Sequence, residues 1–179
     1  MSIEAAQVPS LRSPLSSISL SPTIARMSSL EAKIPPPAVA AVVAVAMWGT
    51  SKLAPLLQVP NALRLGAAVA IVLVGIGFSA AGILAFRRAR TTVNPTKPEE
   101  ATSLVNSGVF RITRNPMYVG LACVLVALAV FLSSAWTLLG PVAFVLYIGR
   151  FQIAPEERAL TKLFGREYAD YQAKVRRWL

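Results

Sequence analysis

The stretch from Leu65 to Phe86 constrains the fold of this chain most, because none of its 22 residues is charged. An α-helix needs about 20 consecutive apolar residues to cross the hydrocarbon layer of a membrane. Backbone groups inside that layer have to be bonded within their own segment, which favours a helix over an open strand. The basic sequence 87–90 ends the run. The pattern therefore predicts a membrane-spanning helix here.

Two other uncharged stretches predict further spans. Residues 34–51 carry no charge, and Pro37 suits the first turn of a helix, where the missing N–H costs nothing. Residues 116–149 are also uncharged but too long for one span, and the sequence Ser-Ser-Ala-Trp at 133–136 divides them into a hairpin. The expected fold is an all-α integral membrane protein with about four transmembrane helices, over about 37–51, 65–86, 116–132 and 136–150.

The net charge of +10 could indicate nucleic-acid binding, but the Lys and Arg residues adjoin the apolar runs and no nucleic-acid motif is present. Beside such runs, basic residues set membrane orientation and contact anionic lipid, so the lipid bilayer is the expected partner. The single cysteine, Cys123, excludes a disulfide within the chain, and the absence of histidine excludes histidine acid–base chemistry and histidine metal sites. No metal site is expected.

The two ends of the chain differ in character. Residues 1–33 are rich in Ser and Pro and lack periodicity, so we expect a disordered N-terminal segment before one membrane domain over 34–179, with Met27 a possible natural start. From Pro155 to about residue 177 we expect cytoplasmic amphipathic helices, beginning at Pro155-Glu156-Glu157 and bent or divided at Gly165. One apolar face is predicted to hold Leu160, Leu163, Phe164, Tyr168, Tyr171 and Val175.

Membrane orientation follows from the basic residues. The connector 87–115 holds six Lys or Arg residues and the tail from Arg150 is also basic, whereas the hairpin tip at 133–136 has none. By the positive-inside rule, the connector, the tail and both termini are expected in the cytoplasm. The connector 52–64 is only weakly basic and lies on the opposite side. The basic, aromatic end of the chain, Lys174 to Trp178, suits a membrane surface.

Two polar blocks are predicted to form one site at the cytoplasmic surface. The first runs from Leu104 to Tyr118 and contains Val105, Gly108, Phe110 and Arg111, followed by Arg114-Asn115-Pro116-Met117-Tyr118. The second contains Glu156-Glu157, Phe164-Gly165, Tyr168, Tyr171 and Val175-Arg176-Arg177-Trp178. In this order and spacing, from about Leu65 to the end, the chain resembles the isoprenylcysteine carboxyl methyltransferases and the related phospholipid N-methyltransferases.

The resemblance implies a membrane methyltransferase-like domain that uses S-adenosylmethionine. The cofactor would be enclosed between the membrane helices and the C-terminal helices. The family usually has Arg-His-Pro-x-Tyr where this chain has Asn115, which can hydrogen-bond but cannot titrate. Glu156 matches the family's acidic cofactor ligand. Carried over by position, the cofactor-binding residues would be Ser103, Leu104, Val105, Phe110, Asn115, Pro116, Met117, Tyr118 and Glu156.

The resemblance also implies three residues that would take part in the reaction: Arg150, Gln152 and Glu157. Glu157 completes the acidic pair, and relatives place a substrate-contacting arginine about one helical turn before it. Gln152 has that spacing here, with Arg150 two residues earlier. The implied acceptor is a lipophilic or membrane-partitioning molecule, such as an isoprenylcysteine-type carboxylate or a related small amphiphile. The short loops between the apolar runs favour a bacterial protein, so the expected place is the bacterial cytoplasmic membrane.

Two other interpretations stay open at the level of sequence. One is a non-enzymatic four-helix membrane protein, such as a small transporter or an assembly factor. The four apolar runs hold no ionisable Asp, Glu, Lys or Arg, which counts against a proton-coupled transporter. The other is a family member with altered chemistry, including reductases of the same membrane architecture, which the replacement of histidine by Asn115 leaves possible.

Overall fold

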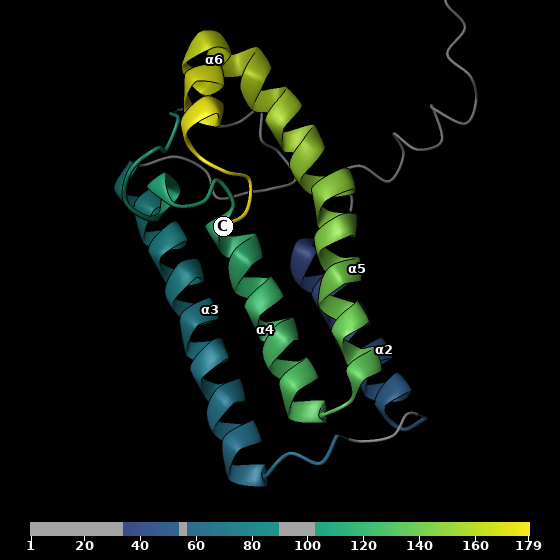
Figure 1. Cartoon of the computed structure of the whole chain (residues 1–179). Coiled ribbons are helices and arrows are strands. Elements are labelled where there is room, and N and C mark those ends of the chain that lie inside the picture. Colours follow the sequence, from purple (N-terminus) through teal and green to yellow (C-terminus); the bar gives the residue numbers. More distant parts are fainter. Residues whose placement is uncertain (1–33, 54–56, 90–102) are drawn as a thin grey trace, which may run out of the picture.

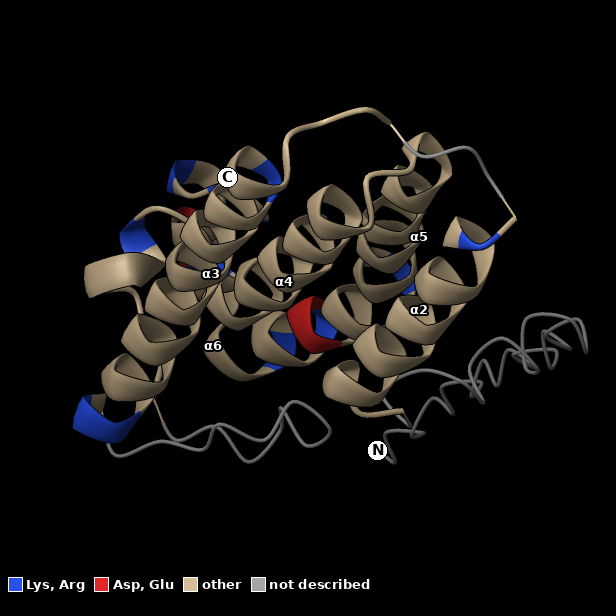
Figure 2. Ribbon diagram, turned by 90° about the horizontal axis from the view of Figure 1, so that it is seen from below, with Lys and Arg blue, Asp and Glu red and all other residues tan. Residues whose placement is uncertain are grey.

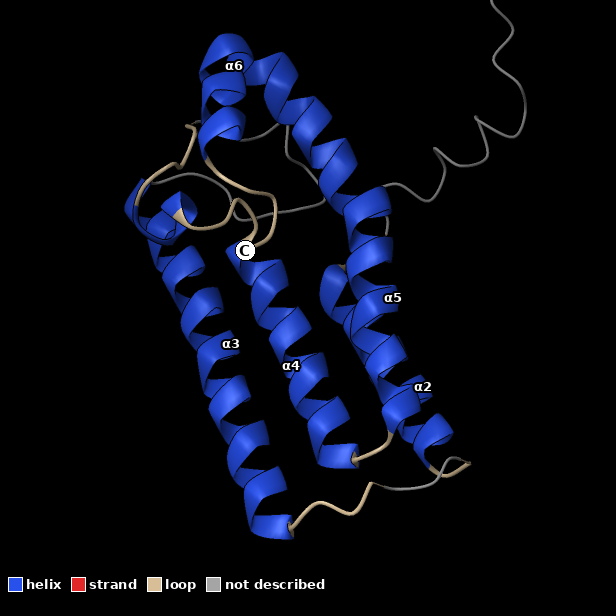
Figure 3. Cartoon of the chain, in the orientation of Figure 1, coloured by secondary structure: helices blue, strands red, loops and turns tan. Residues whose placement is uncertain are grey.

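A computed structural model describes residues 34–53, 57–89 and 103–179, and every regular element in these ranges is a helix (Figure 3). The predicted all-α fold is confirmed for this part of the chain, whereas the predicted disorder of 1–33 lies outside the described residues. In order, the helices are α2 (Pro36–Ser51), α3 (Asn61–Ala89), the 3-10 turn η2 (Gly108–Arg111), α4 (Pro116–Leu132), the 3-10 turn η3 (Ala135–Leu138), α5 (Leu139–Ile148), the π-helical turn η4 (Gly149–Ile153) and α6 (Ala154–Lys174).

Helix α4 is the centre of the bundle. It packs against α3 on one side and against α2 and α5 on the other (Figure 1). A core of buried side chains joins α2, α4 and α5, among them Met47, Leu125, Phe144 and Ile148. Helix α5 continues through η4 into α6, which bends over the end of the bundle and returns toward the start of α4 (Figure 1). This course brings the second polar block to the first.

Small residues allow α3 and α4 to approach closely. A Cβ atom added to Gly75 would lie 2.8 Å from the carbonyl oxygen of Gly120 and 2.8 Å from Cβ of Cys123. One added to Gly82 would lie 3.0 Å from the ring of Pro116, at the first turn of α4. Close backbone approach at small residues is how helices commonly pack in lipid. The contact at Gly82 holds the first turn of α4, which contains Tyr118, close against α3.

The outer surface of the bundle is apolar. Val42, Leu73 and Leu146 are 70%, 62% and 69% exposed, and only Ala68, Gly75 and Gly82 of α3 are buried. An apolar surface this extensive indicates contact with lipid rather than with water. Two helical segments, Asn61–Ala89 and Ala135–Lys174, are long and apolar enough to cross a membrane, whereas α2 and α4 have 16 and 17 residues.

Charged residues gather at the helix ends and along α6 (Figure 2). The segment from Ala135 has no charge before Arg150, and its 40 residues would span about 60 Å if straight, twice the thickness of the hydrocarbon layer. No more than about half of it can therefore fit inside that layer. Helix α6 holds every charged residue of this segment except Arg150.

Three sequence-based expectations need correction. Residues 61–64 belong to helix α3 rather than to the preceding connector. Helix α6 begins at Ala154, as Pro155-Glu156-Glu157 predicts, but it is continuous with α5 through the π-helical turn η4 and does not follow a loop. Leu163 is 46% exposed and does not share the face predicted for it. The predicted bend at Gly165 is confirmed, since this residue has a φ of 49° and a ψ of −119° inside α6.

The contact between α3 and α4 gives a test of the packing. We expect Gly75→Ala to lower the melting temperature in detergent, because an extra methyl group at a filled contact costs about 1–3 kcal/mol. Gly77→Ala, two residues along the same helix, is the control, since nothing lies within 4 Å of its added Cβ. Equal melting temperatures for the two variants would contradict the close approach of the helices.

Candidate active site

Tyr118 and Glu156 form the central contact between the two polar blocks. Pro116 opens α4 and places Tyr118 in its first turn, where the ring is only 5% exposed. The Tyr118 hydroxyl donates a hydrogen bond of 2.5 Å to Oε1 of Glu156. The two residues are 38 positions apart in the chain. This bond therefore brings together one residue from each predicted half of the site.

Gln152 supports the same carboxylate. Its amide Nε2 donates a hydrogen bond of 2.9 Å to Oε1 of Glu156, and its side chain is buried. The two residues are four positions apart, so they share one face of the helix. Gln152 lies in the π-helical turn η4, and π-helical turns inside α-helices are frequent at functional sites.

Glu157 has a different environment from that of its neighbour. Arg177 donates Nε to Oε1 at 3.1 Å and Nη2 to Oε2 at 2.5 Å, which is a bidentate pair. Nη1 of Arg114 lies 3.0 Å from Oε1 as an ion pair without hydrogen-bond alignment. Two guanidinium groups therefore balance the Glu157 carboxylate. Glu156, in contrast, is held by neutral donors.

Burial raises the pKa of Glu156 from 4.5 to about 7. The hydrogen bonds from Tyr118 and Gln152 oppose this rise, because they favour the charged carboxylate, and the nearby charge of Glu157 adds to it. Glu156 therefore changes protonation near neutral pH. Perturbed groups of this kind cluster at functional sites.

The C-terminal residues also reach this site. The side chain of Asn115 donates Nδ2 to the carbonyl oxygen of Arg177 at 2.9 Å. Trp178 packs against the core shared by α2, α4 and α5. Arg177 and Trp178 therefore have partners within the protein, and the suitability of the chain end for a membrane surface stays a prediction. The Arg-Arg-Trp ending belongs to the pattern that carries the family resemblance. Arg114 and Arg177, however, are not among the predicted site residues.

Several predicted cofactor residues lie in a packed apolar cluster instead of an open space. Val105 and Phe110 are buried with Tyr168 and Tyr171 of α6, and Leu104 packs against them. The Tyr171 hydroxyl donates to the carbonyl oxygen of Phe110 at 2.7 Å. This cluster packs the part of α6 that follows Gly165 against the first polar block and so supports that block.

The remaining predicted residues occupy the edges of the site. The Ser103 hydroxyl lies 3.4 Å from the carbonyl oxygen of Ala89, at the end of α3. Pro116 and Met117 pack against Gly82. Arg150 is exposed, and its guanidinium lies over the ring of Phe151 at 5.7 Å. Their roles toward a cofactor or a substrate stay predictions.

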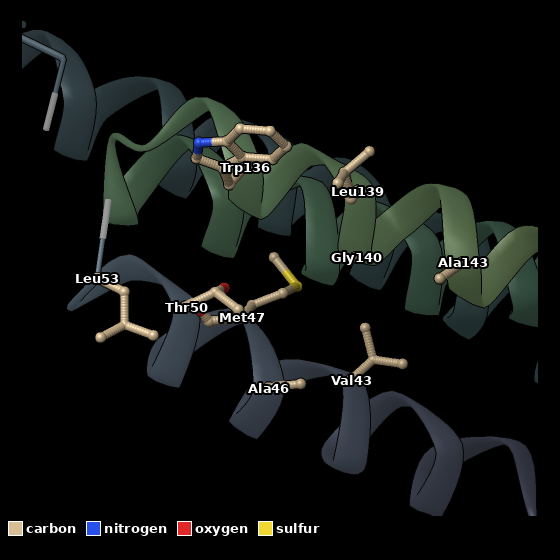
Figure 4. Close-up of a pocket in the computed structure, with 9 residues that line it drawn as sticks. All are labelled: Val43, Ala46, Met47, Thr50, Leu53, Trp136, Leu139, Gly140 and Ala143. Carbon is tan, nitrogen blue, oxygen red and sulfur yellow. The ribbon is translucent and has the colours of Figure 1, made fainter. Parts of the chain in front are cut away.

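The described surface includes two grooves of small-molecule size. One of about 490 Å³ adjoins the site and is lined by Ala154, Glu157, Arg158, Thr161, Lys162 and Gln172. Its volume lies within the range of small-molecule pockets, about 300–1,000 Å³. The other, of about 460 Å³, is apolar and lies between α2 and α5, where Met47 faces Gly140 (Figure 4). It is near the hairpin tip, at the opposite end of α5 from Glu156.

Comparisons with known proteins support the family that the sequence resembles. Residues 63–167 match the family model described as phospholipid methyltransferase. An uncharacterized protein of Haemophilus influenzae is 46% identical over 63 residues, which are 35% of this chain and all of that protein. A probable protein-S-isoprenylcysteine O-methyltransferase of Oryza sativa subsp. indica is 33% identical over 108 residues, 59% of this chain and 55% of the relative.

A third relative, the protein-S-isoprenylcysteine O-methyltransferase B of Arabidopsis thaliana, is 32% identical over 96 residues. These residues are 52% of this chain and 47% of the relative, so the chain spans about half the length of the plant proteins it matches. No solved structure matches the chain.

The raised pKa of Glu156 predicts a stability that depends on pH. The folded state binds the proton more tightly than the unfolded state, so this group's contribution to stability falls as pH rises from 4.5 through about 7. Glu156→Gln cannot ionise, so we expect its melting temperature to rise relative to that of the wild type as the pH is raised from about 5 to about 8. Melting curves of both proteins in detergent measure this difference. A difference that does not change with pH would contradict the raised pKa.

Proposed function

Because this chain belongs to the phospholipid methyltransferase family, we propose that it is an integral membrane enzyme that transfers a methyl group from S-adenosylmethionine to a lipophilic acceptor. The observation that carries the proposal is the hydrogen bond between Tyr118 and Glu156. It joins the two sequence blocks that characterise the family resemblance into one partly buried polar site at one end of an apolar bundle.

The residues at this site fit the proposed donor. S-adenosylmethionine is a cationic molecule with hydroxyl and ammonium donors, for which a shielded carboxylate such as Glu156 is a suitable acceptor. Tyr118 adds an aromatic ring, which can contact a cation. The groove beside Glu157 is large enough for a small molecule and adjoins this carboxylate pair. The bond between Tyr118 and Glu156 supports holding the donor between residues 113–118 and the start of α6, and the groove adds space along α6 itself.

The donor would supply a methyl group already activated by the positive sulfonium. The chain would then have to bind the donor and the acceptor, orient them toward each other and exclude water from the site. Tyr118 and Gln152 fix the Glu156 carboxylate in one orientation, and burial removes competing water from it. A thiolate or carboxylate acceptor needs no proton removed during transfer. The non-titrating Asn115 in place of histidine is therefore compatible with this chemistry.

We propose a small lipophilic or amphiphilic molecule as the acceptor. The plant relatives are named for isoprenylcysteine O-methylation, but this chain covers only about half their length. Gln152 stands where the resemblance places an arginine for the substrate, and its amide is bonded to Glu156. A cation for a carboxylate acceptor would have to come from elsewhere, and Arg150 is the nearest candidate in sequence. An isoprenylcysteine-type carboxylate therefore stays one option within the proposed class.

We also propose four membrane spans, with the site and both termini in the cytoplasm of a bacterium. Helices α2 and α4 have 16 and 17 residues, near the lower limit of about 17 for a span, and both are packed in the bundle. The end of the bundle that carries the site holds Arg87, Arg88, Arg111 and Arg114, whereas the described residues of the opposite end hold Lys52 and Arg64. This excess of positive charge supports a cytoplasmic site.

Binding of S-adenosylmethionine to the purified protein, measured by titration calorimetry in detergent, tests the proposal. We expect wild type to bind and Glu156→Ala to weaken binding by at least about ten-fold, because hydrogen bonds to a charged group contribute about 1.5–3 kcal/mol. Glu167→Ala, which removes an exposed glutamate of the same helix, is the matched control. Absence of binding by the wild type would overturn the proposed donor. Equal binding by both variants would overturn only the site.

A further inference from the structure

The residues after α6 are fixed to the start of α4 by main-chain and side-chain bonds. Helix α6 ends at Lys174, and Val175 is extended, with a φ of −124° and a ψ of 135°. The backbone N–H of Arg114 then donates to the carbonyl oxygen of Arg176 at 3.0 Å. The carbonyl oxygen of Arg177 accepts from Asn115 at 2.9 Å and from the Thr113 hydroxyl at 3.3 Å. We call residues 175–178 the strap.

Side chains of the strap reach two further parts of the molecule. Arg177 holds both oxygens of Glu157, at the start of α6, and Trp178 packs on the core between α2, α4 and α5. The strap thus contacts the segment 113–115, the second glutamate and the bundle itself. Chain ends are usually poorly ordered unless they are tied down, and this one is tied by several independent contacts.

The position of the strap connects it to the site. Asn115 directly precedes Pro116 and lies three residues before Tyr118, and Glu157 directly follows Glu156. The strap therefore holds the segment that leads into the first turn of α4, where Tyr118 lies, and the residue that follows Glu156. The Arg177 side chain is 41% exposed, whereas that of Glu157 is only 13% exposed, so the strap crosses the rim of the site.

Asn115 suits this contact through its amide N–H. A carbonyl oxygen only accepts hydrogen bonds, so the side chain facing it has to donate. Aspartate has nearly the same shape but would place an oxygen against the oxygen of Arg177. A neutral histidine keeps an N–H donor. The chemistry at this position therefore requires a donor and does not require a titrating group.

We propose that Asn115 and Arg177 are positioning residues for donor binding, which act by holding the strap across the two walls of the site. This inference rests on the proposed function. Neither residue has to touch the reacting atoms. With the strap in place, the segment before α4 and the start of α6 keep the spacing at which Tyr118 and Glu156 meet. When it is released, both walls lose a shared support and the donor binds less tightly.

Two measurements on the full-length protein in detergent test the inference. Hydrogen exchange followed by mass spectrometry reports whether the strap is in place, and calorimetry reports the affinity for S-adenosylmethionine. We expect Asn115→Asp and Arg177→Ala to speed exchange in the strap and to weaken the donor affinity by about ten-fold, the equivalent of about 1.4 kcal/mol. Asn115→His and Arg177→Lys, which keep a donor and a charge, should restore part of both.

Lys174→Ala is the charge-matched control, because Lys174 is an exposed cation at the end of α6 and precedes the strap. It should match wild type in both measurements. Faster exchange of the strap with unchanged donor affinity would overturn the inference and leave the proposed function intact. Unchanged exchange in Asn115→Asp and Arg177→Ala would overturn the strap itself. A wild type that does not bind the donor would overturn the proposed function, and the positioning role with it.

Discussion

The structure depends on keeping a carboxylate partly out of water at the end of an apolar bundle. Burial of a charged group is costly unless hydrogen bonds compensate for the lost hydration. Here Tyr118 from α4 and Gln152 from the π-helical turn both donate to Glu156, and burial still raises the pKa of this residue to about 7. The first turn of α4 places Tyr118 and the π-helical turn η4 places Gln152, so two distant segments meet at one carboxylate.

The paired glutamates divide two tasks between them. Glu156 faces neutral donors and is the carboxylate suited to a cationic or hydroxyl-bearing ligand. Glu157 is balanced by Arg114 and Arg177 and ties the chain end to the site. The negative charge of Glu157 adds to the raised pKa of Glu156, after the larger effect of burial. Adjacent residues of one type thus have separate roles because they point at different partners.

Much of this arrangement could be predicted from the sequence. Uncharged runs gave the approximate bounds of α2, α3 and α4, and the ordered polar blocks led to Tyr118 and Glu156, which the structure joins. The continuity of α5 with α6 could not be predicted, because Pro155 is tolerated in a helical turn and reads like a helix start. The fold-back of Arg177 and Trp178 was also missed. A basic, aromatic chain end suits a membrane surface in general, and its contacts with Asn115 and Glu157 depend on the tertiary fold.

A double-mutant cycle tests the central claim, that Tyr118 and Glu156 act together as one donor-binding unit. The dissociation constant of S-adenosylmethionine would be measured for wild type, Tyr118→Phe, Glu156→Gln and the double variant. If the hydroxyl acts by orienting the carboxylate, its loss matters much less once Glu156 is replaced, and the account predicts a coupling energy of about 1 kcal/mol or more. Strictly additive effects of the two substitutions would contradict the account.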